Sequence, residues 1–319
     1  MNYKTLTYIL FLFILFHKGL NADEIKINSS KMKILDEGNI ISAINAKANI
    51  PKKNIEIEGD QAIYDKKNKQ LTIINNVKFF DRLKNIYIEA KKVIYNQITD
   101  IVETYGETYI KIEDKYDVYS YDLFYERKSQ KIYSNKETTI KDEKKNVFNL
   151  EDNFVFDIKK EIVSSDKTNI IDSNNNEYSF EVAKINLKNN EIAGKELEVN
   201  FIDNYFGNPN NQPILKGKGS TSDEYKTKIY KAAFTTCNTV NKACPGWEIQ
   251  TEEFVHDKQK KVFEYKNSWL KLFDRKIFYF PFFSHPDPTI KRKSGFLTPV
   301  YGSSSQNGSW VNIPYFKVI

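Results

Sequence analysis

The motif SHPDP holds the residue types closest to a catalytic set in this sequence. Ser284, His285 and Asp287 could in principle act as nucleophile, base and orienting acid in acyl transfer. However, Pro286 and Pro288 fix an extended chain here, whereas members of such a triad normally converge from separate segments. We therefore expect no catalysis from this motif, and we expect replacement of His285 by alanine to leave function intact.

Other catalytic signatures are missing from the sequence. It contains no Gly-rich phosphate loop, no HExxH and no GxSxG. Its acids are scattered and stand mostly beside lysines, so they do not form the pair of carboxylates that a lyase or glycoside hydrolase would need. The sequence therefore predicts a protein that is not an enzyme.

The two cysteines, Cys237 and Cys244, lie in the motif CNTVNKAC. In an oxidising compartment this short spacing favours a local disulfide, with free thiols as the alternative. A zinc site would need two more soft ligands, and His256, the nearest histidine, is alone. We therefore expect no metal and no cofactor, and we interpret His256 as a turn residue ahead of a hairpin.

The N-terminus has the features of a secretory signal. Residues 1–22 carry Lys4 near the N-terminus, hold no acid, contain the apolar run LTYILFLFILF, and end in GLNA before Asp23. This run is shorter than the roughly 20 apolar residues that a spanning helix needs, so we expect cleavage after Ala22 and an exported protein. An uncleaved N-terminal anchor is the alternative. The net charge of +6 over 319 residues is too small to predict nucleic-acid binding.

Composition and pattern favour β-structure. The chain has 20 Tyr and 22 Phe but only 12 Gly and 9 Pro. Apolar residues alternate with polar ones in short runs, as Ile55 and Ile57 do in NIEIEG and residues 178–182 do in EYSFEV. Polar breaks such as residues 65–70 and 171–177 separate these runs and suit hairpin turns. The sequence therefore predicts an all-β protein.

A repeat of about 30 residues organises the first two thirds of the chain. The tetrapeptides AIYD (62–65), VIYN (93–96), LFYE (123–126) and FVFD (154–157) follow one another at intervals of 31, 30 and 31 residues. A fixed period of this size is typical of stacked supersecondary units that cannot bury their apolar faces alone. We therefore expect residues 23–202 to form one elongated stack of strands, with coincidence in an Ile-, Lys- and Asn-rich sequence as the alternative.

Such a stack could carry lipid if its two sheets splayed apart. The inner faces would then form an apolar trough, and each methylene hidden there gains about 0.8 kcal/mol. Candidate trough residues are Ile55, Ile57, Ile86 and Ile88. Packing in an ordinary closed core is the alternative for each of them, and the sequence does not choose between the two.

The last third of the chain resembles a known family. Beyond residue 203 a Gly-, Pro- and Asn-rich stretch precedes strand-like runs that carry five motifs in a specific order: FTTCN (234–238), PGWEIQTEEFVHD (245–257), YKNSWLKLF (265–273), FYFPFFSHPDPT (278–289) and KRKSGFLTPVYGSSS (291–305). Together they resemble the junction segment of the LptD, or OstA/Imp, family of lipopolysaccharide-assembly proteins of the Gram-negative outer membrane.

The resemblance implies a division of the chain and a function. Members of this family have a periplasmic β-jellyroll that receives lipopolysaccharide from a bridge of similar domains, and an outer-membrane β-barrel plugged by a lipoprotein. On this basis we expect a jellyroll over residues 23–202, junction hairpins with the cysteine pair over 203–275, and the first barrel strands over 276–319. The implied location is the outer membrane, with the N-terminal domain in the periplasm.

The same resemblance suggests roles for particular residues. Prolines cannot donate to a strand ladder, so Pro299 and Pro314 are candidates for a weak seam, a lateral gate through which lipid leaves the barrel. Ordinary prolines at strand starts are the alternative. Lys291, Arg292 and Lys293 are candidates for contact with lipid phosphates, or else form a solvated turn.

Two departures from the family pattern leave questions open. The chain stops at Ile319, after at most two barrel strands, whereas small membrane barrels need eight, so we expect a partial gene product. Cys237 occupies a position that in the family bonds to a cysteine near the far end of the barrel, while Cys244 offers a local partner. A soluble periplasmic lipid carrier made of the same stack is the alternative function, and an envelope polysaccharide lyase is the third.

Overall fold

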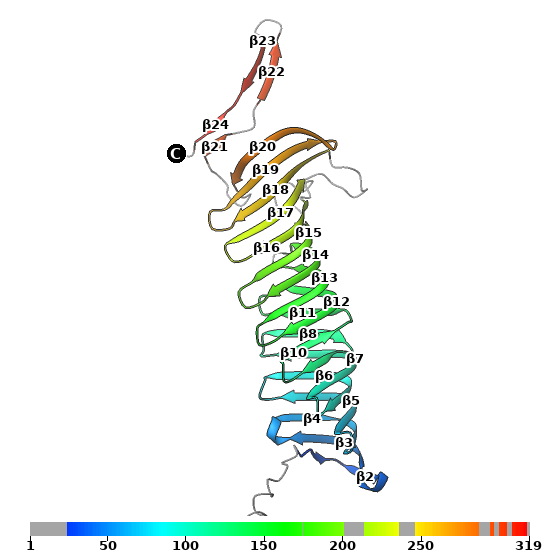
Figure 1. Ribbon diagram of the computed structural model, residues 1–319. Coiled ribbons are helices and arrows are strands. Elements are labelled where there is room, and N and C mark those ends of the chain that lie inside the picture. Colours follow the sequence, from blue (N-terminus) through cyan, green and yellow to red (C-terminus); the bar gives the residue numbers. More distant parts are fainter. Residues whose placement is uncertain are drawn as a thin grey trace, which may run out of the picture. The chain divides into compact units, whose positions relative to one another are not determined.

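The computed structural model describes residues 24–173, 175–200, 214–235, 246–286, 294–296, 300–304 and 308–317 (Figure 1). Nearly all of these residues are in strands or tight turns. Two single 3₁₀ turns, η1 (Asp36–Gly38) and η2 (Pro51–Lys53), are the helical elements in the described ranges, which contain no α-helix. The prediction of an all-β protein is confirmed.

The chain divides into two compact units, residues 1–128 and 129–319. The N-terminal unit is an antiparallel meander in which successive long strands pair with one another. Its strands are β1 (Lys26–Asn28), β2 (Lys31–Leu35), β3 (Ile40–Ile50), β4 (Ile55–Asp65), β5 (Gln70–Asp81), β6 (Ile86–Asn96), β7 (Ile101–Ile112), β8 (Tyr116–Tyr121) and β9 (Phe124–Glu126).

The C-terminal unit repeats this plan, and each strand from β12 to β20 pairs antiparallel with the next. Its strands are β10 (Lys131–Ser134), β11 (Thr138–Asp142), β12 (Val147–Asp157), β13 (Ile162–Ile171), β14 (Glu177–Asn186), β15 (Glu191–Asn200), β16 (Ile214–Ser222), β17 (Lys226–Thr235), β18 (Trp247–Asp257), β19 (Val262–Leu272), β20 (Arg275–Pro286), β21 (Gly295–Phe296), β22 (Val300–Ser304), β23 (Gly308–Asn312) and β24 (Tyr315–Phe316).

Strand β4 changes its alternation near the middle. Its buried residues are Ile55 and Ile57 in the first half but Ala62 and Tyr64 in the second. The neighbouring strand carries an extra residue at this level, where Asn75 and the residue after it adopt positive φ, which asparagine tolerates better than most residues. Since a one-residue shift exchanges the two faces of a strand, the two halves bury opposite faces and enclose a common core.

Two rows of side chains fill the core of the N-terminal unit. Residues paired across adjacent strands form the tyrosine row, Tyr64, Leu71, Tyr95, Val102 and Tyr125. In the other half of the strands, the isoleucine row consists of Ile57, Phe79, Ile88, Ile110 and Val118. Every member of the two rows is buried, so the unit has a packed interior.

Turns on the same side of the meander stack on one another. The backbone N–H of Lys66 donates to the carbonyl of Asn39 at 2.9 Å, and the N–H of Gln97 donates to the carbonyl of Lys69 at 3.0 Å. One period of the sequence repeat therefore corresponds to two strands and their turns. AIYD and VIYN end β4 and β6, LFYE covers β9 and the residue before it, and each of these three contributes its tyrosine to the tyrosine row.

The ladder continues past residue 203, where we predicted a change from jellyroll to junction. β16 pairs with β15 from Ile214 to Ser222, and β17, β18 and β19 follow in the same manner. The strand-like runs predicted between residues 228 and 286 correspond to β17 to β20. The aromatic stretch assigned to the start of a barrel lies in β20, which pairs with β19, whereas β22 pairs with β23 in a small separate sheet. The domain boundaries stay a prediction.

Candidate functional site

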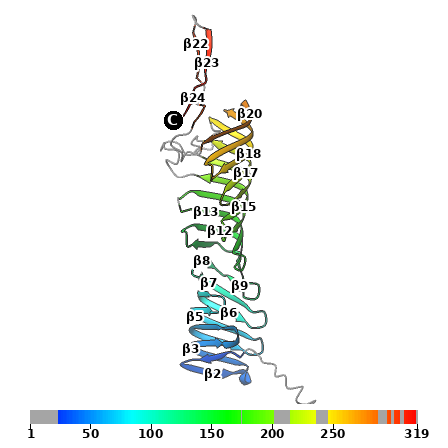
Figure 2. The ribbon, with the colours of Figure 1, turned by 90° about the vertical axis from the view of Figure 1, so that its left-hand side faces the viewer.

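A partly open cavity of about 310 Å³ lies in the C-terminal unit. It is lined by residues of β12 to β19 and their turns, and Figure 2 shows these strands from the side. Its volume is at the lower end of the range typical of small-molecule pockets. The lining consists of Asn146, Phe148, Ile170, Asp172, Tyr178, Phe180, Ile185, Asn186, Leu187, Asn190, Ile192, Leu197, Val199, Leu215, Ser220, Ser222, Thr227, Ile229, Phe254, His256, Lys258 and Phe263.

The cavity is explained by the side chains at one row of positions. In the N-terminal unit, the second and penultimate positions of the strands carry the tyrosine row. The corresponding row in the C-terminal unit, which we call the serine row, has small side chains in its middle. It consists of Ile185, Ile192, Ser222, Thr227, His256 and Phe263. Serine and threonine fill less space than tyrosine, so the two halves of the strands do not close the interior at this level.

Most of the lining is apolar, with polar groups gathered at the serine row. The hydroxyls of Ser222 and Thr227 share a hydrogen bond of 2.7 Å. The Lys258 Nζ donates to Ser222 Oγ at 3.2 Å and to the backbone carbonyl of Asp223. Burial lowers the pKa of the Lys258 ammonium, and the charge of Asp223 offsets this only in part. The cavity can therefore hold an apolar group beside a polar or charged one.

The predicted trough residues lie elsewhere. Ile55, Ile57, Ile86 and Ile88 are at most 3 % exposed and belong to the packed core of the N-terminal unit. Ile57 and Ile88 both pair with Phe79. None of the four lines the cavity of the C-terminal unit, so their contact with a lipid chain remains a hypothesis.

A buried polar cluster joins opposite ends of the strands in the N-terminal unit. The Arg127 guanidinium donates to Asp81 at 2.8 Å and to both carboxylate oxygens of Asp100 at 3.0 Å. The Lys53 ammonium also contacts Asp100, at 3.0 Å. We call this set the Arg127 cluster, and its members are Lys53, Asp81, Tyr95, Asp100, Tyr125 and Arg127.

The cluster satisfies its own charges. Burial would raise the pKa of Asp100, but hydrogen bonds from Tyr95 and Lys53, together with the charges of Arg127 and Lys53, lower it below its usual value. The Tyr125 hydroxyl donates to Asp81 at 3.1 Å, and its ring meets the edge of Phe79 with centroids 6.5 Å apart. These contacts tie the tyrosine row to the isoleucine row, so the N-terminal unit is closed. Sequence reading missed the cluster, although an acid at the end of the apolar run in VKFFD was a signal for it.

The structure does not assemble the SHPDP motif into a catalytic set. Strand alternation directs Ser284 and His285 to opposite faces of β20. The His285 Nε2 lies 3.0 Å from the Tyr265 hydroxyl. Asp287 lies outside the described residues. No group of three or more potential metal ligands occurs within the described ranges.

The interpretation of His256 as a turn residue is wrong. β18 extends to Asp257, so His256 is in the strand, where it pairs with Phe263 and lines the cavity. The strand continues because the apolar pattern of residues 254 and 255 is buried against β19 rather than ending at the turn.

Several predicted site residues lie outside the described residues. These are Cys237, Cys244, Lys291, Arg292, Lys293 and Pro299. Pro314 is described and lies between β23 and β24, outside both strands. Nothing in the structure brings Pro314 together with the cavity lining.

The fold and the cavity define a class: an all-β protein of stacked antiparallel strands, one unit of which encloses an apolar cavity with a charged rim. Within this class, the chain is similar in sequence to curated proteins that carry one name. It is 31 % identical over 143 residues to the LPS-assembly protein LptD of Polaromonas sp., and 32 % identical over 134 residues to that of Nitrosococcus oceani. Each match covers 42 % of this chain and 17 % of the relative. The chain therefore carries an LptD-like segment.

Further comparisons are narrower. The LPS-assembly protein LptD of Legionella pneumophila is 32 % identical over 103 residues, which cover 31 % of this chain and 12 % of the relative. No protein-family model matches the chain. A solved structure of LptH from Pseudomonas aeruginosa, a periplasmic component of a lipopolysaccharide transport device, covers 45 % of this chain and 82 % of its own, with 11 % identity and a TM-score of 0.21.

The relatives are named as assembly proteins, in agreement with the expectation of a non-enzyme. Among the described residues, no helix is long and apolar enough to cross a membrane.

Proposed function

We propose that this chain acts in lipopolysaccharide transport and assembly at the outer membrane, and that its C-terminal cavity holds acyl chains during transfer. The observation that carries the proposal is the apolar cavity of about 310 Å³ inside an LptD-like chain. Each methylene that enters such a cavity from water gains about 0.8 kcal/mol, so a long acyl chain can bind there without a specific polar contact.

Site-specific photocrosslinking in cells tests this proposal. A photoreactive amino acid at Ile229, which is buried and lines the cavity, should crosslink to lipopolysaccharide. The same residue at Tyr230, the next position on β17 and 43 % exposed on the opposite face, is the matched control and should not crosslink. Equal labelling at the two positions, or labelling at neither, contradicts the proposal.

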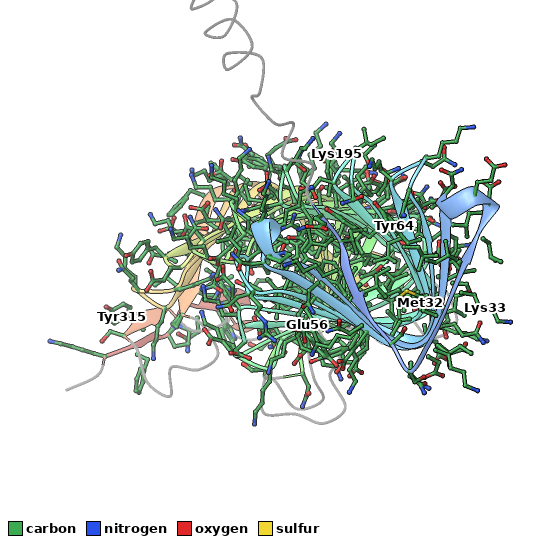
Figure 3. The ribbon with its side chains drawn as sticks, turned by 90° about the horizontal axis from the view of Figure 1, so that it is seen from below. Met32, Lys33, Glu56, Tyr64, Lys195 and Tyr315 are labelled. Atoms are coloured by element: carbon green, nitrogen blue, oxygen red, sulfur yellow. The ribbon has the colours of Figure 1, made fainter. Side chains whose placement is uncertain are left out.

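We also propose that the free edge at β1 and β2 receives a periplasmic bridge protein of similar β-jellyroll fold. Both strands pair only with β3 among the described strands, so their outer edges offer unpaired backbone groups for strand addition. Exposed apolar side chains accompany this edge, including Met32, shown beside Lys33 in Figure 3, and Ile34. Replacing Met32 and Ile34 with lysine should weaken binding of a purified bridge protein in light scattering, whereas unchanged binding would contradict this interface.

The remaining elements of the proposal concern the C-terminal end. We propose that Pro299 and Pro314 weaken a lateral gate in a barrel plugged by a lipoprotein, and that Lys291 to Lys293 contact lipid phosphates. Replacing both prolines with alanine should slow lipid export. Replacing the three cations with glutamine should reduce crosslinking of this segment to lipopolysaccharide that carries phosphate groups. Unchanged export and crosslinking in these variants would favour ordinary strand-start prolines and a solvated turn.

A soluble periplasmic lipid carrier is the second candidate. It is favoured by the fact that all described residues of the cavity lining fall between residues 146 and 263, and none of them belongs to β21 to β24. Fractionation of cells separates the two functions. A chain recovered with the outer membrane after a salt wash supports the assembly protein, whereas recovery in the periplasmic fraction supports the carrier.

A further inference from the structure

Lys258 brings a positive charge to the cavity lining. It is half-buried, and the other 21 lining residues that the structure describes include no lysine or arginine. Its Nζ contacts two neutral oxygens, Ser222 Oγ and the backbone carbonyl of Asp223, and it forms no ion pair with any carboxylate in the part of the chain that the structure describes. An ammonium has three N–H donors, so one donor is left for a ligand.

The acidic residue of the lining is already engaged. The carboxylate of Asp172 accepts hydrogen bonds from the backbone N–H and the side-chain amide of Asn176, at 2.9 and 3.0 Å, and from the Tyr178 hydroxyl at 3.2 Å. A carboxylate with these donors is stabilised in place and does not need the ammonium of Lys258. The charge of Lys258 therefore remains available to an anion that enters the cavity.

Position makes this cation useful. Lys258 follows the end of β18, next to Ser222 and Thr227 in the serine row, while apolar residues such as Leu215 and Ile229 line the cavity further along the strands. A ligand with an apolar chain and an anionic end would match both parts of the lining. Burial disfavours the charged form of Lys258, and the nearby charge of Asp223 offsets this only in part, so binding of an anion would relieve the remaining cost.

We propose that Lys258 binds the phosphate monoester of an amphiphile whose acyl chain occupies the cavity. This inference rests on the proposed function, and it adds the head-group chemistry and the residue that recognises it. The ligand is the amphiphile rather than free phosphate, because one ammonium beside neutral oxygens is a weak site without the buried chain.

Calorimetric binding of dodecyl phosphate to the whole purified chain, below the concentration at which it forms micelles, tests the proposal. Lys258→Gln should weaken binding of dodecyl phosphate about tenfold, as expected for loss of one charge-assisted hydrogen bond. Dodecyl maltoside should bind the variant and the unchanged protein equally, and inorganic phosphate should bind neither. Lys258→Arg should restore most of the affinity, because it keeps the charge.

Lys260→Gln is the matched control. Lys260 is two residues further on in the same turn, its side chain is 71 % exposed, and it is absent from the lining. Equal weakening by Lys258→Gln and Lys260→Gln would mean a general surface charge effect and would overturn the proposal. Binding of inorganic phosphate as tight as that of dodecyl phosphate would overturn it too.

A third variant separates this inference from the proposed function. Val199→Phe places a larger side chain in the cavity and should weaken both dodecyl ligands. If Val199→Phe weakens both while Lys258→Gln changes neither, the head-group role is wrong and the acyl-chain site stands. If no dodecyl ligand binds the unchanged protein, both proposals fail. Tryptophan fluorescence checks that the variants are folded, because Trp247 and Trp269 lie on β18 and β19.

Discussion

Replacing Arg127 with methionine should destabilise the N-terminal unit by about 3 to 5 kcal/mol, the usual cost of removing one partner from a buried ion pair. The guanidinium donates to Asp81 and to both oxygens of Asp100. The Arg127 and Asp81 side chains are 5 % and 0 % exposed, so water cannot replace these bonds. Because Asp100 keeps its contact with Lys53 in the variant, the expected loss of stability stays within this range.

Hydrogen exchange measured on the whole chain provides the assay. A loss of 3 to 5 kcal/mol should speed exchange of the slow amides of β4 to β7 by roughly a hundredfold to a few thousandfold. Amides of β18 and β19 are the internal control and should be unchanged, since every member of the Arg127 cluster belongs to the N-terminal unit. Tryptophan fluorescence cannot replace this assay, because all three tryptophans lie beyond residue 246.

The pH dependence identifies the cause of the loss. In the unchanged protein the pKa of Asp100 is lowered despite its burial, so its contribution to stability is present above the unfolded pKa of about 3.9 and is lost as pH falls below it. In Arg127→Met the charge of Arg127 no longer offsets the desolvation of Asp100, so the pKa of Asp100 should rise. The loss of unfolding free energy relative to the unchanged protein should therefore become smaller as the pH falls from 7 to 5. Adding Asp81→Asn should recover part of the stability, because it neutralises the carboxylate that loses its cation while Lys53 still pairs with Asp100. A deficit that does not change with pH, or that the added substitution deepens, would refute the electrostatic reasoning.

Three further predictions concern other parts of the chain. Gly59→Ala should cost about 1 to 3 kcal/mol in thermal unfolding, because its Cβ would lie 2.6 Å from an isoleucine methyl and 3.0 Å from a backbone oxygen, whereas Gly219→Ala, with its nearest atom at 3.9 Å, should change little. A hydrogen bond from a backbone N–H lowers the pKa of the Asp257 carboxyl. The unfolding free energy should therefore decrease as the pH falls below about 3.9, and Asp257→Asn should make this decrease smaller. Non-reducing tryptic mapping should recover Cys237 and Cys244 in one linked pair, since a lysine separates them; thiols that are alkylated without reduction would contradict a local disulfide.

The strands could be predicted from the sequence because alternation of period two is a local property. Residues 55–57 and 62–64 each read as inward-facing pairs, and they are buried in β4. Between these two pairs the inward-facing positions change from odd-numbered to even-numbered residues, and this interruption of the alternation can be read from the sequence. This change of phase corresponds to a bend that folds β4 around the core. The bend depends on the extra residue in β5, and the extra residue is revealed only by the register in which β4 and β5 pair.

The cavity and the Arg127 cluster could not be predicted, because both depend on contacts between distant residues. Arg127 is 46 residues from Asp81 and 27 from Asp100 along the chain. Ser222 and Thr227 read as polar strand ends flanking a turn, and nothing local indicates that they replace tyrosine-sized residues in an inward row. The resemblance to LptD drew attention to the C-terminal motifs, one of which contains the lining residues Phe254 and His256, but it did not indicate a cavity.

Comparison of the two units indicates which of them accommodates an acyl chain at the lower cost in free energy. To reach Ile57 and Ile88, a chain would have to separate the Arg127 cluster at about 3 to 5 kcal/mol. It would also have to part the rings of Phe79 and Tyr125, and each such side chain contributes roughly 1.5 to 3 kcal/mol when buried. At about 0.8 kcal/mol per methylene, some ten methylenes would only balance these losses. The cavity of the C-terminal unit demands no such opening, so crosslinking at Ile229 should be stronger than any crosslinking at Ile57, and Arg127→Met should strengthen the signal at Ile57 alone. Stronger labelling at Ile57 than at Ile229 in the unchanged protein would contradict this reasoning and would make the N-terminal core the preferred binding site.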